Sequence, residues 1–175
     1  MENRPQIFAC VGPESTGKTT LCGQLASRFG GAIVPEIARG YLTFQGGIYQ
    51  QKDLITIAKK QLELESRITF DNKGPIFCDT DVLVVKVWQE FKYGESNSEI
   101  DLIFSKQQSR KYLLTYPDLE WQPDSLRENP NELLEIFNYY EKTLTEMGAD
   151  YRIVRGNGEE RLKCAIDAIN QMNLG

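Results

Sequence analysis

A glycine-rich segment near the amino terminus has the residue types and spacing of a phosphate-binding loop. Residues 12–19 read GPESTGKT and fit the pattern G-x-x-x-x-G-K-[ST]. Backbone N–H groups of such a loop converge on phosphate oxygens, and the following helix adds the positive end of its dipole. We therefore expect a nucleoside triphosphate to contact Gly12, Pro13, Glu14, Ser15, Thr16, Gly17, Lys18, Thr19 and Thr20. Lys18 would add a charge beside the β- and γ-phosphates, and the Thr19 hydroxyl would ligate Mg²⁺.

Glu14 is an unusual residue at this position, because a carboxylate inside an anion-binding loop repels phosphate unless it points away. One interpretation is a solvated turn residue. The other is a partner for Arg39 or for a group on the substrate. The residues alone leave both interpretations open.

Two carboxylates follow an expected strand at residues 75–78, in the order Asp79-Thr80-Asp81. Acids at the carboxyl end of a strand beside a phosphate loop can hold Mg²⁺ or position a hydroxyl acceptor. We expect Asp79 to contribute to the metal site and catalysis, and Asp81 to contribute to acceptor binding and catalysis. The alternative is that Asp79 or Thr80 only caps the next helix.

Glu36 follows a second expected strand at residues 32–35 and precedes Arg39. A carboxylate at this edge could take the proton of an accepting hydroxyl, so Glu36 is a candidate base and Arg39 a candidate acceptor-binding residue. A glutamate favoured by the dipole of the following helix is the alternative.

The segment at residues 116–130, YPDLEWQPDSLRENP, is long for a loop in a compact domain, and such loops are often lids. Arg127 is its only arginine, and a lid arginine can stabilise the charge on a transferring phosphoryl group. Trp121 could stack on a ligand ring. The alternatives are a surface ion pair for Arg127 and an apolar plug for Trp121.

Short apolar runs alternate with amphipathic segments along the chain, which predicts an α/β fold with a parallel sheet covered on both faces. Right-handed crossovers place the carboxyl ends of the strands at one edge, where ligands bind. Strands are expected at residues 6–11, 32–35, 75–78, 111–115 and 149–154. Helices are expected at residues 18–29, 37–44, 53–70, 82–93, 99–108, 131–147 and 159–172. We expect a single domain over residues 1–175.

The composition narrows the function classes. The 175 residues carry a net charge of −5, which argues against a broad nucleic-acid-binding face. There is no histidine, so acid–base chemistry must come from other side chains. The four cysteines form no C-x-x-C pair, and we expect reduced thiols. With no signal-peptide pattern and no run of membrane-spanning length, a cytoplasmic protein without a membrane partner is expected.

Four segments together resemble the NadR-type ribosylnicotinamide kinases and their stand-alone relatives: GPESTGKTTL, PEIARGYL, FCDTD and LLTYPDLEWQPDSLREN. The resemblance spans residues 6–160. It implies a three-layer P-loop NTPase fold with strand order 2-3-1-4-5 and a lid at residues 116–130. It also implies ATP and Mg²⁺ at Lys18 and Thr19, with Asp79 and Asp81 at the metal or the ribosyl group. Glu36 would lie in a base-like place, with Arg127 as the lid arginine.

The activity implied by this resemblance is phosphorylation of the 5′-hydroxyl of nicotinamide riboside with ATP, a step of NAD salvage. Two departures are visible: the loop reads GPESTGKT where the best-known members have a second glycine and serine residues, and no DNA-binding or adenylyltransferase module accompanies the kinase segment. Two other functions stay open, a deoxynucleoside or nucleotide kinase and a regulatory ATP-binding module without kinase activity.

Overall fold

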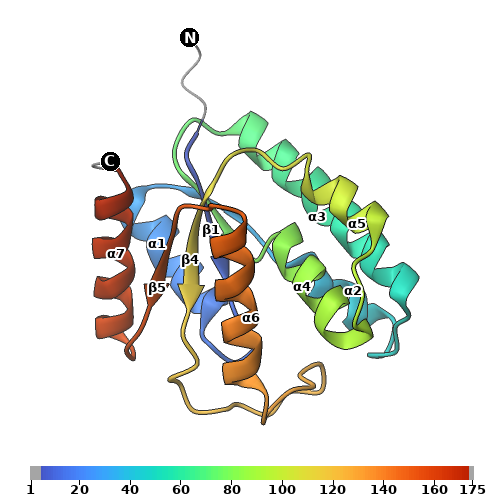
Figure 1. Cartoon of the computed structure of the whole chain (residues 1–175). Helices are drawn as coiled ribbons and strands as arrows, with labels where there is room; N and C mark the ends of the chain where they lie inside the picture. The colour runs from blue at the N-terminus through green and yellow to red at the C-terminus, as the bar shows by residue number, and fades with distance from the viewer. Residues whose placement is uncertain (1–4, 174–175) are drawn as a thin grey trace.

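A computed structural model describes residues 5–173 as a chain of alternating strands and helices (Figure 1). The strands are β1 (Ile7–Val11), β2 (Ala32–Val34), β3 (Ile76–Asp79), β4 (Lys111–Thr115) and β5 (Tyr151–Val154). The helices are α1 (Lys18–Phe29), α2 (Ile37–Phe44), α3 (Gln51–Asp71), α4 (Val82–Tyr93), α5 (Ser98–Phe104), α6 (Leu133–Glu146) and α7 (Glu159–Asn173).

The five strands form one parallel sheet in the order β2-β3-β1-β4-β5, the order that the family resemblance implied. β1 lies at the centre, where Cys10 pairs with Asp79 of β3 on one side and with Leu113 of β4 on the other. Because all strands run in the same direction, their carboxyl ends meet at one edge. The segment after β1, the residues after β3 and the long loop after β4 therefore start at a common edge.

Helices cover both faces of the sheet and give the expected three layers (Figure 1). One face packs against α1 and α7, through residues such as Leu25 and Ile169. The other face packs against α4 and α6, through Leu83 and Phe137, with part of α3. A further apolar cluster joins α2, α3, α4 and α5 outside this layer. The sheet is buried on both faces, which explains why its strands read as continuous apolar runs.

Most element boundaries agree with the sequence pattern, since α1 and α4 end at the left-handed glycines Gly30 and Gly94. α5 is shorter than expected and ends at Phe104 rather than at residue 108. Ser105 and Lys106, which follow α5, are exposed, and the Gln107 side chain donates a hydrogen bond to Asp81. Within residues 5–173, no helix combines the length and the apolar character needed to cross a bilayer.

Candidate functional site

The phosphate-binding loop connects β1 to α1, and its glycines hold backbone conformations that other residues rarely adopt. Gly12 has φ 132° and Gly17 has φ 74°. A Cβ atom on Gly12 would lie 2.6 Å from Thr115 Oγ1 and 2.8 Å from the Thr115 carbonyl oxygen. Any side chain at Gly12 would therefore push the loop away from β4.

Thr16 fixes the shape of the loop from inside. Its hydroxyl donates to the Pro13 carbonyl at 2.7 Å and lies 2.7 Å from the Thr115 hydroxyl, which in turn bonds the Val11 carbonyl at 3.0 Å. These bonds tie the loop to the ends of β1 and β4. The backbone N–H groups are thus preorganised before any ligand binds.

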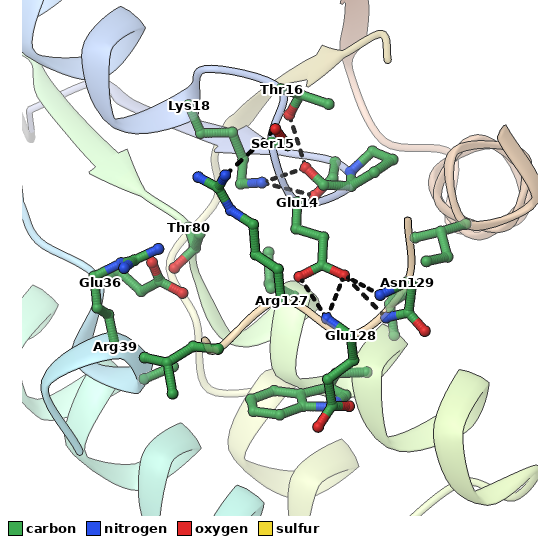
Figure 2. A pocket seen from close by; sticks show the side chains of 18 of the residues that line it. Glu14, Ser15, Thr16, Lys18, Glu36, Arg39, Thr80, Arg127, Glu128 and Asn129 are labelled. Carbon is green, nitrogen blue, oxygen red and sulfur yellow. Dashed lines mark hydrogen bonds between the residues drawn. The ribbon is translucent and has the colours of Figure 1, made fainter. Parts of the chain in front are cut away.

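Lys18 begins α1 and turns back across the loop (Figure 2). Its ammonium group donates to the carbonyl oxygens of Gly12 at 3.0 Å and Pro13 at 2.5 Å. Burial lowers the pKa of Lys18, while the negative charges of Glu36 and Asp79 raise it. The ammonium group is thus placed where the loop would wrap a polyanion.

Asp79 ends β3 and is 5% exposed, so it lies beneath the cavity and not on its wall. Burial raises the pKa of Asp79, and the Thr19 hydroxyl and the Lys18 ammonium group lower it. Its Oδ1 atom is buried without a hydrogen-bond partner among the described residues. A buried carboxylate oxygen left free near a threonine hydroxyl fits a Mg²⁺ ligand set, in which phosphates and water supply the remaining oxygens.

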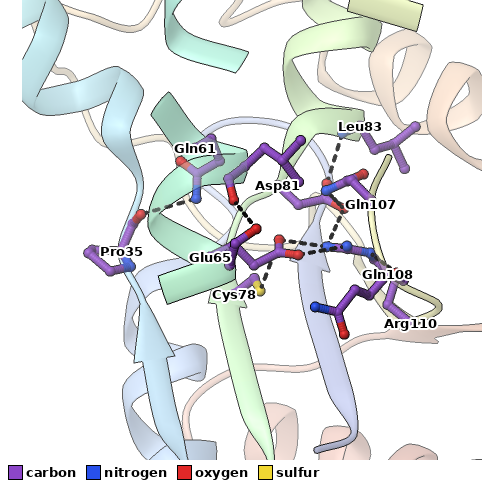
Figure 3. Close-up of polar contacts among 11 residues, drawn as sticks. Pro35, Gln61, Glu65, Cys78, Asp81, Leu83, Gln107, Gln108 and Arg110 are labelled. Atoms are coloured by element: carbon purple, nitrogen blue, oxygen red, sulfur yellow. Dashed lines mark hydrogen bonds and ion pairs between the residues drawn. The ribbon is translucent and has the colours of Figure 1, made fainter. Parts of the chain in front are cut away.

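Asp81 is not brought into the cavity, which corrects its expected place in acceptor binding and catalysis. The side chain is 0% exposed and accepts a hydrogen bond from the Leu83 N–H at 3.0 Å, as the cap of α4. Its other oxygen accepts from Gln107 at 3.3 Å and from Arg110 at 3.4 Å (Figure 3). Thr80, held at φ 69°, is the member of the Asp79-Thr80-Asp81 segment that lines the cavity.

Glu36 and Arg39 enter the cavity from the start of α2. Burial raises the pKa of Glu36, and the charges of Lys18, Arg39 and Arg127 lower it. Glu36 occupies the N-cap position of α2, but its side chain makes no cap hydrogen bond to the helix. Arg39 donates a 2.9 Å hydrogen bond to Asp124 and thereby ties α2 to the loop after β4.

The loop after β4 folds back over the phosphate-binding loop. Arg127 lines the cavity, and its guanidinium group lies 3.4 Å from the Ser15 hydroxyl and bonds the Gln122 carbonyl. Trp121 does not line the cavity; its ring centre lies 5.9 Å from the Arg127 guanidinium carbon. Arg127 thus lines the cavity and Trp121 does not.

These residues surround one cavity of about 650 Å³. The cavity is also lined by apolar and aromatic side chains that the sequence pattern did not mark as site residues: Leu42, Val87, Trp88, Phe91, Ile136 and Tyr140. A signal was present, because Val84, Trp88 and Phe91 lie at helical spacing on α4, directly after the acidic segment. Lys92, Glu128 and Glu132 add charges to the same wall.

Comparisons with known proteins agree with this fold. The family model described as AAA domain matches residues 7–161, and a search of curated proteins finds no match. A crystal structure of NadR protein in complex with NR (nicotinamide riboside) is similar, with a TM-score of 0.82 and 22% identity. The match covers 96% of this chain and 50% of that one, so the chain spans about half the length of NadR.

Two smaller proteins are also similar over nearly their whole length. Thymidylate kinase from Ehrlichia chaffeensis matches with a TM-score of 0.66 and 12% identity, covering 96% of this chain and 98% of that one. Deoxyadenosine kinase from M. mycoides matches with a TM-score of 0.66 and 11% identity, covering 95% of this chain and 100% of that one. The chain therefore belongs to the AAA domain family, and its fold is the P-loop kinase fold found in NadR, thymidylate kinase and deoxyadenosine kinase.

Proposed function

We propose that this protein transfers the γ-phosphoryl group of ATP to the 5′-hydroxyl of a ribosyl compound, and that the compound is nicotinamide riboside. One observation carries the proposal: a single cavity joins the phosphate-binding loop to an aromatic chamber, with Glu36 on its wall near Lys18. A hydrolase needs only the loop and a water molecule. A kinase also needs space for the acceptor, and the aromatic part of the cavity lining supports such a space here.

The proposed mechanism assigns each polar group one task. The loop N–H groups and Lys18 hold the β- and γ-phosphates and offset the charge that develops during transfer. Mg²⁺ near Thr19 and Asp79 would neutralise phosphate charge and orient the phosphates. Glu36 accepts the proton of the attacking hydroxyl, and Arg127 stabilises the transferring group from the lid side.

The chamber favours a flat, uncharged or cationic ring over an anionic acceptor. Trp88, Phe91 and Tyr140 offer aromatic faces, which attract a pyridinium ring through cation–π contact. Two cations on the wall of the cavity are already paired, Arg39 with Asp124 and Lys92 with Glu128, and a third, Arg127, is assigned here to the transferring phosphoryl group. An acceptor that brings its own phosphate would have to compete for Arg127 or displace one of these pairs, so a nucleoside fits better than a nucleotide.

A deoxynucleoside kinase is the second candidate. It is favoured by the likeness to deoxyadenosine kinase, which extends over 95% of this chain. The two candidates differ in the ring and the 2′-hydroxyl of the acceptor, and share ATP and the phosphate loop.

A panel of acceptors tests the proposal. The protein is incubated with ATP, Mg²⁺ and one compound at a time: nicotinamide riboside, the ribonucleosides, the deoxynucleosides or their monophosphates. ADP release and product mass are recorded, with Lys18→Ala as the blank. We expect the highest rate with nicotinamide riboside. Turnover only with deoxynucleosides would favour the second candidate, and no stimulation by any acceptor would contradict both and favour a regulatory ATP-binding module.

A further inference from the structure

The Glu14 carboxylate belongs to a loop whose backbone N–H groups bind anions, and its hydrogen-bond partners lie in the segment after β4. It points away from the loop towards the segment after Arg127 (Figure 2). Its Oε1 atom accepts hydrogen bonds from the N–H groups of Glu128 at 3.0 Å and Asn129 at 2.7 Å, and from the Asn129 side-chain amide at 3.2 Å. The Oε2 atom lies 3.3 Å from the Glu128 N–H. Glu14 is therefore neither a solvated turn residue nor a partner of Arg39.

We propose that Glu14 is a positioning residue that anchors residues 122–129 of the lid to the phosphate-binding loop and thereby sets Arg127 at the transferring phosphoryl group. The role of Arg127 in this statement rests on the proposed function. The anchoring of the lid by Glu14 does not, because it follows from contacts that exist without a substrate.

The anchor works because two consecutive residues of the phosphate loop hold opposite ends of the lid. Ser15, at φ 60°, accepts a hydrogen bond from the Gln122 N–H at 2.9 Å, while Glu14 holds Glu128 and Asn129. Arg127 lies between these two attachments, with its guanidinium group beside Ser15. With both ends fixed to the loop, the Arg127 side chain has a defined position relative to the phosphates rather than sampling the space above them.

The negative charge of Glu14 favours the closed lid over the open one. When the lid is closed, the carboxylate accepts three N–H donors, and bonds of this charge-assisted kind are stronger than neutral ones. When the lid is open, the same carboxylate is left without these partners next to the phosphate site, where it repels a polyanion. Bound nucleotide therefore favours the closed lid.

Tryptic cleavage after Arg127 tests the anchor without any need for turnover. Arg127 is the only arginine between residues 116 and 130, and that segment contains no lysine, so a fragment beginning at residue 128 reports opening of the lid. Wild type, Glu14→Ala and Glu14→Gln are compared, with Glu120→Ala as a control that removes an exposed carboxylate from the same loop. We expect cleavage about tenfold faster in Glu14→Ala, the size expected for loss of a charge-assisted hydrogen bond. Glu14→Gln keeps an accepting oxygen but loses the charge, so its rate should lie between those of wild type and Glu14→Ala. Glu120→Ala should stay at the wild-type rate.

Wild-type cleavage rates in Glu14→Ala would overturn the proposal. Equal acceleration in Glu14→Ala and Glu14→Gln would overturn it as well, because the effect would then come from charge and not from the accepted bonds. If the alanine variant does not fold, amide hydrogen exchange on the wild-type protein decides. The N–H groups of Glu128 and Asn129 should exchange more slowly than that of the exposed Glu120, and equal exchange would contradict the anchor.

The link to Arg127 has its own readout. With an active acceptor, Glu14→Ala should lower kcat about tenfold and change the KM for ATP less than about twofold, and Glu14→Gln should restore part of the lost kcat. Faster proteolysis with unchanged kcat would keep the anchor and remove its role in catalysis. Absence of turnover in wild type would contradict the proposed function alone and leave the proteolysis result unaffected.

Discussion

Arg110 and Glu65 form a bidentate ion pair (Figure 3). The Nη1–Oε2 distance is 2.7 Å, the Nη2–Oε1 distance is 2.8 Å, and both side chains are 2% exposed. Arg110 also lies 3.4 Å from Asp81. The pair ties α3 to the segment that enters β4 and encloses Asp81 from below. Asp81 is therefore part of the structural support of the site, and Thr80 and Asp79 are held by its fixed position.

This support predicts that Asp81 matters for stability and not for acceptor binding. Asp81→Ala removes the cap of α4 and one partner of a buried arginine, so we expect the free energy of unfolding to fall by about 3 kcal/mol. Denaturant unfolding measures this change, with the exposed Asp167→Ala as a control that should change it by less than about 0.5 kcal/mol. Asp81→Asn keeps an accepting oxygen for the cap and should give a KM for the acceptor within about twofold of wild type. A large rise in that KM would restore Asp81 to the binding site.

Asp79 is expected to determine the requirement for Mg²⁺. Asp79→Asn replaces a buried carboxylate, whose Oδ1 has no hydrogen-bond partner among the described residues, with a neutral amide that is a weaker ligand for Mg²⁺. The Mg²⁺ concentration that gives the half-maximal rate should therefore rise about tenfold or more. Titration of Mg²⁺ at fixed ATP measures it, and calorimetric binding of a non-hydrolysable ATP analogue with Mg²⁺ checks it without turnover. Asp71→Asn, an exposed change at the end of α3, is the matched control. An unchanged Mg²⁺ requirement in Asp79→Asn would remove Asp79 from the metal site.

The pH dependence of the rate follows from Glu36. A base must be deprotonated to accept a proton, and burial raises the pKa of Glu36 above its usual 4.5. The deprotonated fraction is lost as the pH falls through that raised value, so the acidic limb of kcat/KM should lie above pH 4.5. Glu36→Gln should lower kcat by about a hundredfold or more and abolish this limb, whereas the exposed Glu63→Gln should change neither. If Glu36→Gln kept the acidic limb of the wild-type pH profile, that limb would belong to the titration of another group.

Trp88 is expected to select the acceptor ring. Its indole N–H donates to the Tyr49 hydroxyl at 2.9 Å, which fixes the ring on the wall of the cavity. Loss of one stacking face raises the KM for the acceptor about tenfold in Trp88→Ala, with the KM for ATP unchanged. Trp88→Phe keeps an aromatic face and should recover most of the affinity. Steady-state kinetics with both substrates varied separates the two constants, and equal effects on both KM values would contradict a role confined to the acceptor.

The parallel sheet and the phosphate loop were predictable because both depend on short-range signals, whereas the strand order came from the family resemblance. Strand, glycine-rich loop and helix follow one another within residues 7–29, and the alternation of elements fixes a parallel sheet. Glu36 and Arg127 were also found to line the cavity, since strand ends and a long loop mark the ligand edge.

The fate of Asp81 and Glu14 was not predictable in the same way, because it depends on partners far away in sequence. Asp81 is enclosed by Arg110, which is 29 residues away, and Glu14 binds Asn129, which is 115 residues away. An acid after a strand has the same local pattern whether it caps a helix or faces a ligand. The aromatic side chains of the cavity wall could not be predicted for a related reason. Trp88 and Phe91 have the helical spacing that is typical of any buried helix face.

Transfer of a radiolabelled γ-phosphoryl group tests the central claim most directly. The protein is mixed with γ-labelled ATP, Mg²⁺ and nicotinamide riboside, and label is followed into the nucleotide product and into inorganic phosphate, with Lys18→Ala as the blank. The proposed function predicts one labelled nicotinamide mononucleotide for each ADP formed and little free phosphate. Release of the label as inorganic phosphate at a rate that does not depend on the acceptor would contradict it.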